Sequence, residues 1–112
     1  MNIEARRVHD VLIIDMSGKL DTLSARDAEA RLLDIIEGET GRVLLNVEKL
    51  AYVSSAGLRV IIQAGKVLQG NRGEIGICNA RGGVRDVLEV FDMHSLMKIY
   101  DTEKEAFAAF LA

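Results

Sequence analysis

Leu50-Ala51-Tyr52-Val53-Ser54-Ser55-Ala56-Gly57-Leu58-Arg59-Val60-Ile61-Ile62 links the end of a predicted strand to the start of a predicted helix. The apolar run Val43–Val47 comes before it, and apolar side chains continue after it at helical spacing as far as Leu68. Such alternation of strand and helix is typical of an α/β fold. We expect the other elements to pack around this strand, loop and helix.

Two adjacent serines stand where the helix begins. The first four backbone N–H groups of a helix have no partner inside it, and a serine oxygen accepts such hydrogen bonds well. If Ser54 caps the helix, Ser55 takes the first helical position, and its hydroxyl points outward at the positive end of the helix dipole. A phosphoryl group would be tolerated there, because helix N-termini favour anions. The alternative is that both serines serve only as caps.

The helix carries apolar residues on two faces. The face expected to meet the core contains Leu58, Ile61, Ile62 and Gly65. The opposite face contains Ala56, Val60, Gln63 and Val67, with Ala64 at its edge and with Arg59 and Lys66 between the two faces. A solvated face should be polar, so we predict that this second face is an outward docking strip for another protein. A helix buried on both sides is the alternative.

Length and composition indicate one domain that covers residues 1–112. With 112 residues and 49% hydrophobic content, the chain is long enough to bury one core and shows no sign of a second. No apolar run is long enough for a membrane-spanning helix, and Met1–Arg7 lacks the apolar core of a signal peptide. We therefore expect a cytoplasmic protein.

Charged and metal-binding residue types argue against several classes of function. The net charge of −3 and the scattered basic residues do not suit nucleic-acid binding. The single cysteine, Cys78, lies in an apolar run and is expected to be buried, so neither a disulfide nor a metal cluster is predicted. The two histidines, His9 and His94, have no neighbour in the sequence that suits metal binding or activation of a serine. No enzyme activity, metal or cofactor is predicted.

The remaining segments predict a mixed sheet of four to five strands packed against about four α-helices. Strands are expected in a hairpin that turns at Val8–Asp10, and at Arg42–Val47, Glu74–Asn79 and Met97–Tyr100. Helices are expected after a capping box at Ser24, over Ser55–Gln69, around Val84–Phe91 and after a capping box at Thr102. The last helix is expected to bury Phe107, Phe110 and Leu111.

Three motifs resemble the STAS domain family and, within it, the bacterial anti-sigma factor antagonists. They are Gly18-Lys19-Leu20-Asp21, Leu44-Leu45-Asn46-Val47 and Tyr52-Val53-Ser54-Ser55-Ala56-Gly57-Leu58. The family pattern at the third motif is Asp-Ser-(Ser/Thr/Ala)-Gly-Leu, in which the serine after the aspartate is phosphorylated. That serine corresponds to Ser55, two residues before Gly57. The resemblance runs essentially end to end and implies a single STAS-type domain.

The resemblance also implies a regulatory function. Such a protein binds an anti-sigma factor that is also a serine kinase, releases the sigma factor, and stops binding when the kinase phosphorylates it. The Gly18–Asp21 turn is then expected beside the phosphorylated serine, and a phosphatase is a further candidate partner. The expected partner-binding residues are Asp21, Ser54, Ser55, Ala56, Gly57, Arg59, Val60, Gln63 and Val67. No nucleic acid or membrane partner is expected, and the chain is expected to be a monomer, with a homodimer as the alternative.

Two positions depart from the family pattern. Ser54 stands where the family has an aspartate, so Ser54 is an alternative phosphoacceptor to Ser55. Asn46 stands in the central strand where an aspartate is common. The alternative function is that of a STAS subunit in a lipid or anion transporter, or in a stress-signalling complex, without a role toward a sigma factor.

Overall fold

Two antiparallel strands open the chain and begin a five-stranded sheet. In the computed structural model, which describes residues 1–110, β1 (Asn2–Val8) pairs with β2 (Val11–Leu20) through a turn at His9 and Asp10. β3 (Arg42–Val53), β4 (Glu74–Cys78) and β5 (Lys98–Tyr100) follow in spatial order β1-β2-β3-β4-β5, and each is parallel to the strand before it. The predicted mixed sheet is confirmed.

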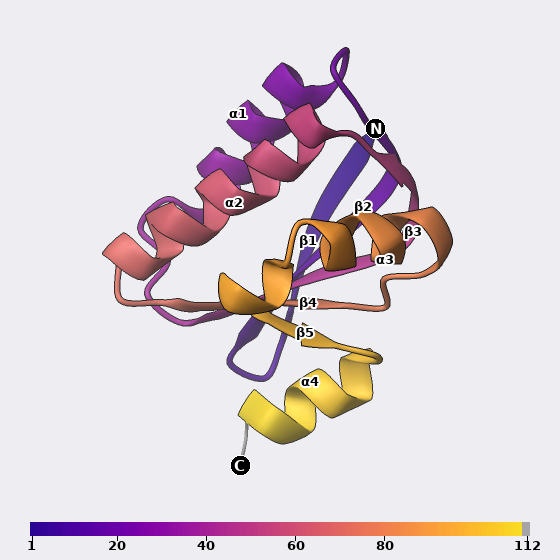
Figure 1. Cartoon of the computed structure of the whole chain (residues 1–112). Helices are drawn as coiled ribbons and strands as arrows, with labels where there is room; N and C mark the ends of the chain where they lie inside the picture. The colour runs from indigo at the N-terminus through magenta and orange to yellow at the C-terminus, as the bar shows by residue number, and fades with distance from the viewer. Residues whose placement is uncertain (111–112) are drawn as a thin grey trace.

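Helices cover both faces of this sheet (Figure 1). They are α1 (Ala25–Ile36), α2 (Ser55–Gly70), α3 (Gly82–Val90), the short 3₁₀ helix η1 (Met93–Ser95) and α4 (Glu103–Phe110). Figure 1 shows α1, α2 and α3 on one face and α4 on the other. Parallel crossover connections are right-handed, and the strands add in one direction from β2 to β5, so the three crossover helices share one face.

Alternation along β3 divides the core between the two faces. Val43, Leu45 and Val47 belong to the larger cluster, which contains the buried residues of α1, α2 and α3. Leu44 belongs to a smaller cluster on the α4 side, together with Val11, Ile13, Cys78, Ala106 and Phe110. Because β3 is covered on both faces, its segment Val43–Val47 is apolar apart from Asn46 instead of alternating. Cys78 is 0% exposed, as predicted.

α2 is buried on two sides, which corrects the predicted docking strip. Val60 is 2% exposed and Ala64 is 0% exposed, and both belong to the cluster that contains the buried residues of α1. α1 packs along α2 (Figure 1) and covers the face that the sequence predicts to point outward. The expectation that Val60 is available to a partner is therefore wrong. Helical periodicity locates the apolar faces of a helix, but it does not say which element covers each face.

The ends of two elements differ from the predictions. β3 continues to Val53, because it pairs with β2 as far as Leu20. Ser24 precedes α1 but makes no capping hydrogen bond to it, so the predicted capping box there is wrong. Its hydroxyl instead accepts from the N–H of Asp21 at 3.0 Å and donates to the carbonyl oxygen of Lys19 at 2.7 Å.

The last helix begins as predicted. The hydroxyl oxygen of Thr102 accepts from the N–H of Glu105 at 3.1 Å, which caps α4. Phe110 is buried against the sheet and Phe107 is partly buried beside it, whereas Leu111 lies outside the described residues.

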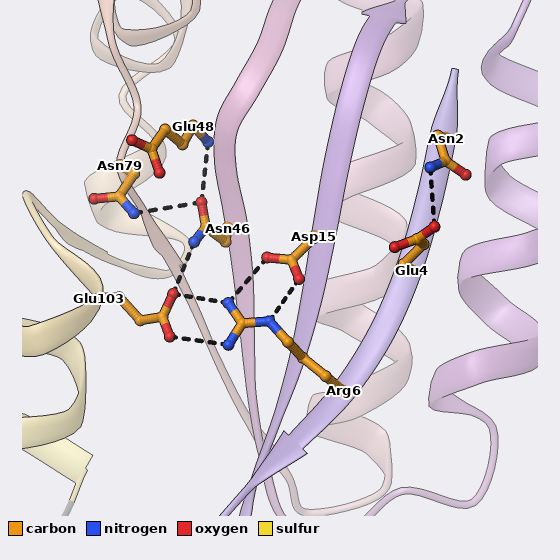
Figure 2. A network of polar contacts seen from close by, with 8 residues as sticks. All are labelled: Asn2, Glu4, Arg6, Asp15, Asn46, Glu48, Asn79 and Glu103. Atoms are coloured by element: carbon orange, nitrogen blue, oxygen red, sulfur yellow. Dashed lines mark hydrogen bonds and ion pairs between the residues drawn. The ribbon is translucent and has the colours of Figure 1, made fainter.

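A polar network attaches the start of α4 to the sheet (Figure 2). Arg6 on β1 donates to both oxygens of Asp15 on β2, at 2.6 and 3.1 Å. It also donates to both oxygens of Glu103 on α4, at 3.2 and 2.9 Å. These hydrogen bonds, with Asp15 first and Glu103 second, raise the pKa of Arg6 above its ordinary value.

The same network explains the amide at position 46. The side-chain nitrogen of Asn46 donates to Glu103 at 2.8 Å, and its oxygen accepts from the N–H of Glu48 and from the amide of Asn79. An aspartate here could not donate to Glu103 and would place a second negative charge against it. Asn46 is therefore suited to its contact with α4, on the sheet face opposite α2 (Figure 1).

Candidate functional site

The carboxyl ends of β2 and β3 bring two loops together. Leu20 is paired with Val53 where the two strands end, and the N–H of Ser54 donates to the carbonyl oxygen of Leu20 at 2.9 Å. The Gly18–Asp21 turn and the serine loop are therefore neighbours in space, although they lie far apart in the chain. The adjacency that the family resemblance implies is present.

Gly57 allows this close contact. A Cβ atom added at Gly57 would lie 2.3 Å from the carbonyl oxygen of Leu20 and 2.7 Å from its Cγ. Both distances are well below van der Waals contact, so only glycine fits here without a shift of the backbone. Gly57 is itself buried. It positions the loop, and its side of the helix is not open to a partner.

The two serines have different surroundings. Ser54 has an extended backbone, is half-buried, and its hydroxyl oxygen accepts from the N–H of Gly57 at 3.1 Å. Ser54 is thus the N-cap, as predicted, and its carbonyl accepts the first helical hydrogen bond from Leu58 at 2.8 Å. Ser55 is the first residue of α2 and is exposed. A modifying enzyme can reach the hydroxyl of Ser55, whereas the oxygen of Ser54 is already used in the cap.

The exposed row of α2 is polar and carries positive charge. After Ser55 it contains Arg59, Gln63, Lys66 and Gln69, and α2 contains no aspartate or glutamate. Ala56 and Val67 are half-buried beside this row. Among the described residues, no salt bridge involves Arg59 or Lys66. In a chain of net charge −3, this row is a local surplus of cations without carboxylate partners.

Asp21 orders the neighbouring turn. One of its carboxylate oxygens accepts from the N–H groups of Leu23 and Ser24, each at 3.0 Å. These bonds, the one from the Ser24 backbone first, hold the pKa of Asp21 below its ordinary value. One oxygen of this carboxylate is therefore already hydrogen-bonded within its own loop.

Two exposed apolar side chains, one in the Asp21 turn and one at the end of β3, were not predicted as site residues. Leu23, in the Asp21 turn, is 92% exposed, and Tyr52, which pairs with Lys19 across β2 and β3, is 51% exposed. For Leu23, the available signal was an apolar residue inside an otherwise polar turn. We use the term serine surface for the exposed residues of α2 that begin with Ser55, which are Ser55, Arg59, Gln63, Lys66 and Gln69.

The histidines lie at the other end of the sheet from the serines. His9 precedes β2 and His94 precedes β5, so both lie at the amino ends of parallel strands, whereas Ser54 follows the carboxyl end of β3. The ten residues of β2 span roughly 30 Å, so the His9 imidazole is far beyond hydrogen-bond reach of either serine.

Within residues 1–110, no three His, Cys, Asp or Glu side chains are grouped so that they could hold a metal ion. In the same part of the chain, no helix has the length and hydropathy that crossing a bilayer requires.

Comparisons with known proteins place these features in context. Residues 2–106 match the STAS domain family. BtrV of Bordetella bronchiseptica, named as a candidate anti-sigma factor antagonist, is 31% identical over 98% of this chain and 95% of its own length. An anti-sigma factor antagonist of Mycobacterium paratuberculosis has a crystal structure similar to this fold, with a TM-score of 0.89 and 18% identity, over 99% of this chain and 94% of that one. The phosphorylated form of the Bacillus cell fate determinant SpoIIAA is also similar, with a TM-score of 0.69 and 20% identity, over 96% of this chain and 98% of that one.

Proposed function

The chain belongs to the STAS domain family, and from this membership we propose that it is an anti-sigma factor antagonist whose binding is switched by phosphorylation of Ser55. The unphosphorylated chain binds an anti-sigma factor that is also a serine kinase, and this binding releases the sigma factor. Phosphorylation of Ser55 by that kinase ends the binding, and a phosphatase restores it. The protein acts in the cytoplasm, where its partner meets the sigma factor.

One observation carries the proposal: Ser55 is exposed at the first position of α2, while Ser54 is engaged as its cap. A phosphate at Ser55 adds roughly −1.5 to −2 charges and three acceptor oxygens. At the first turn of a helix this charge meets the positive end of the dipole, so the fold tolerates it. Modification can therefore change binding without unfolding the domain.

The loss of binding follows from the position of Ser55 on the serine surface. Ser55 and Arg59 are exposed on one face of α2, so a partner that covers this surface also approaches Ser55. A phosphate there must lose part of its hydration at the interface, or repel a carboxylate on the other protein. A cost of about 3 kcal/mol reduces affinity more than a hundredfold.

The proposed role is that of a regulator and not of an enzyme. A serine nucleophile needs a base within hydrogen-bond reach, and both histidines lie at the opposite end of the sheet from the serines. Ser55 is thus the substrate of another protein's chemistry.

The proposal is tested first by phosphorylation. The chain is incubated with its cognate anti-sigma factor kinase and ATP, and the mass shift of one phosphate is mapped to a peptide. Ser55→Ala should abolish the shift, whereas Ser54→Ala should retain it. A phosphate that maps to Ser54 would reassign the site.

Binding of the same anti-sigma factor is then measured by calorimetry. Ser55→Ala should bind as the unmodified chain does, and Ser55→Asp should bind at least tenfold more weakly. Equal affinities of the unmodified, Ser55→Ala, Ser55→Asp and phosphorylated chains would defeat the gating mechanism.

A further inference from the structure

We propose that Arg59 is the counter-ion of the switch: it pairs with a carboxylate of the partner protein while Ser55 is unmodified, and with the phosphate once Ser55 is phosphorylated. This inference rests on the proposed function and specifies how the same surface is regulated. The partner surface that faces α2 is accordingly acidic.

Ser55 and Arg59 are spaced as neighbours on one face of α2. Ser55 and Arg59 are four residues apart on α2, and both are exposed. Residues at this spacing are neighbours on one face of a helix, with Cβ atoms about 5–6 Å apart. The acidic group would be the N-terminal member of the pair, which is the favourable orientation. The guanidinium fork also matches the oxygens of a phosphate.

Arg59 differs from most arginines of the chain in its ion pairing. Five of the nine arginines make salt bridges: Arg6, Arg7, Arg42, Arg81 and Arg85. No salt bridge within residues 1–110 involves Arg59. A phosphate on Ser55 therefore meets a cation that has no carboxylate partner to give up.

The helix that carries Ser55 and Arg59 has a net positive charge. α2 has two basic residues, Arg59 and Lys66, and no acidic residue. Such a face attracts a partner with negative charge and disfavours one with positive charge. Of its two cations, only Arg59 is close to the modification site, because Lys66 is eleven residues from Ser55, or about 16 Å along the helix.

Phosphorylation then acts twice on one contact. The phosphate draws Arg59 into a pair within its own helix, so the carboxylate of the partner loses its cation. The remaining negative charge of the phosphate faces that carboxylate and repels it. Both effects are electrostatic, so neither needs the apolar strip that the burial of Val60 rules out.

The pair within the helix is tested without any kinase. Phosphoserine is incorporated at position 55 during translation, and the second ionisation of the phosphate is titrated by phosphorus NMR at about 0.1 M salt, where the Debye length is about 10 Å. The Arg59→Gln variant should raise the pKa of this phosphate by about 0.4. Lys66→Gln is the matched control and should leave it unchanged within about 0.1, because of its distance. Identical titrations of the parent and Arg59→Gln chains would overturn the proposal.

The pair with the partner is tested on the unmodified chain with its cognate anti-sigma factor. Arg59→Gln should weaken binding at least tenfold and reduce the dependence of affinity on salt. Lys104→Gln, which removes an exposed charge on α4 at the other face of the sheet, should do neither. Equal affinities for these two variants would overturn the inference and leave the proposed function standing. Complete absence of binding by the parent chain would instead defeat the proposed function, and the phosphate titration would still decide whether Arg59 is the counter-ion.

Discussion

Replacement of Gly57 by alanine tests the contact between the serine loop and the Leu20 turn. The added Cβ would lie 2.3 Å from the carbonyl oxygen of Leu20, whereas ordinary contact begins at 3.4 Å. The start of α2 must therefore move away from the turn by about 1 Å, to judge from the difference between these distances. The same carbonyl accepts the N–H of Ser54 at 2.9 Å, and the movement weakens or breaks that hydrogen bond.

Three contributions set the expected change in the free energy of unfolding of Gly57→Ala. A backbone hydrogen bond lost in a buried place costs about 2 kcal/mol. Overpacking against the Leu20 side chain costs about another 2 kcal/mol. Alanine recovers about 1 kcal/mol through its higher helix propensity. The net loss in the free energy of unfolding is therefore about 3 kcal/mol, which is a large part of the stability of a small domain.

Urea denaturation followed by circular dichroism measures this loss. With a slope of about 1.5 kcal/mol per molar urea, the midpoint should fall by about 2 M for Gly57→Ala. Gly70→Ala is the matched control in the same helix, because a Cβ there meets no atom within 4 Å. Its midpoint should not fall, and should rise by at most about 0.7 M through the higher helix propensity of alanine. If both variants were equally stable, the close approach of α2 to the turn would not constrain the fold, and the reasoning would be refuted.

Three other substitutions test separate parts of the structure. Val60→Asp should unfold the chain, because it places a carboxylate in the core at a cost above about 4 kcal/mol. A native circular dichroism spectrum would show that α1 does not cover this position. Ser54→Ala should lower the melting temperature by about 4 °C through loss of the cap, and an unchanged value would contradict the capping role. Burial raises the pKa of Cys78 to about 12 from its ordinary 9.0, so the thiol stays protonated in the folded chain while the unfolded thiol ionises. The free energy of unfolding should therefore fall as pH rises above 9.0, by about 1.4 kcal/mol per pH unit. This fall should be steeper than in the Cys78→Ala variant. If the urea midpoints of the two chains changed in parallel between pH 8 and pH 10.5, the prediction would be refuted.

The sequence predicted the features that depend on residues close together in the chain. The hairpin turn at His9, the cap at Ser54 and the cap at Thr102 each involve groups within a few residues of one another. The order of strands and helices followed from apolar spacing and from the right-handed rule for parallel connections. These local signals were enough to place Ser55 at the first turn of an exposed helix start.

Features that depend on distant segments could not be predicted in the same way. Arg6 reaches Glu103 across 97 residues, and nothing in either local sequence indicates that contact. The burial of Val60 depends on α1, which precedes β3 in the chain. Leu23 is exposed in a turn where Asp21 accepts its N–H, and composition does not reveal this backbone geometry.

The burial of Val60 also decides which variants can report on function. Gly57 and Val60 lie inside the structure, so a substitution at either changes stability, and any effect on binding would be ambiguous. Ser55 and Arg59 are exposed, and no salt bridge among the described residues involves Arg59. Substitutions there should leave the free energy of unfolding within about 0.5 kcal/mol of the parent value. A change in partner affinity at these two positions, at constant stability, therefore measures the electrostatic switch itself.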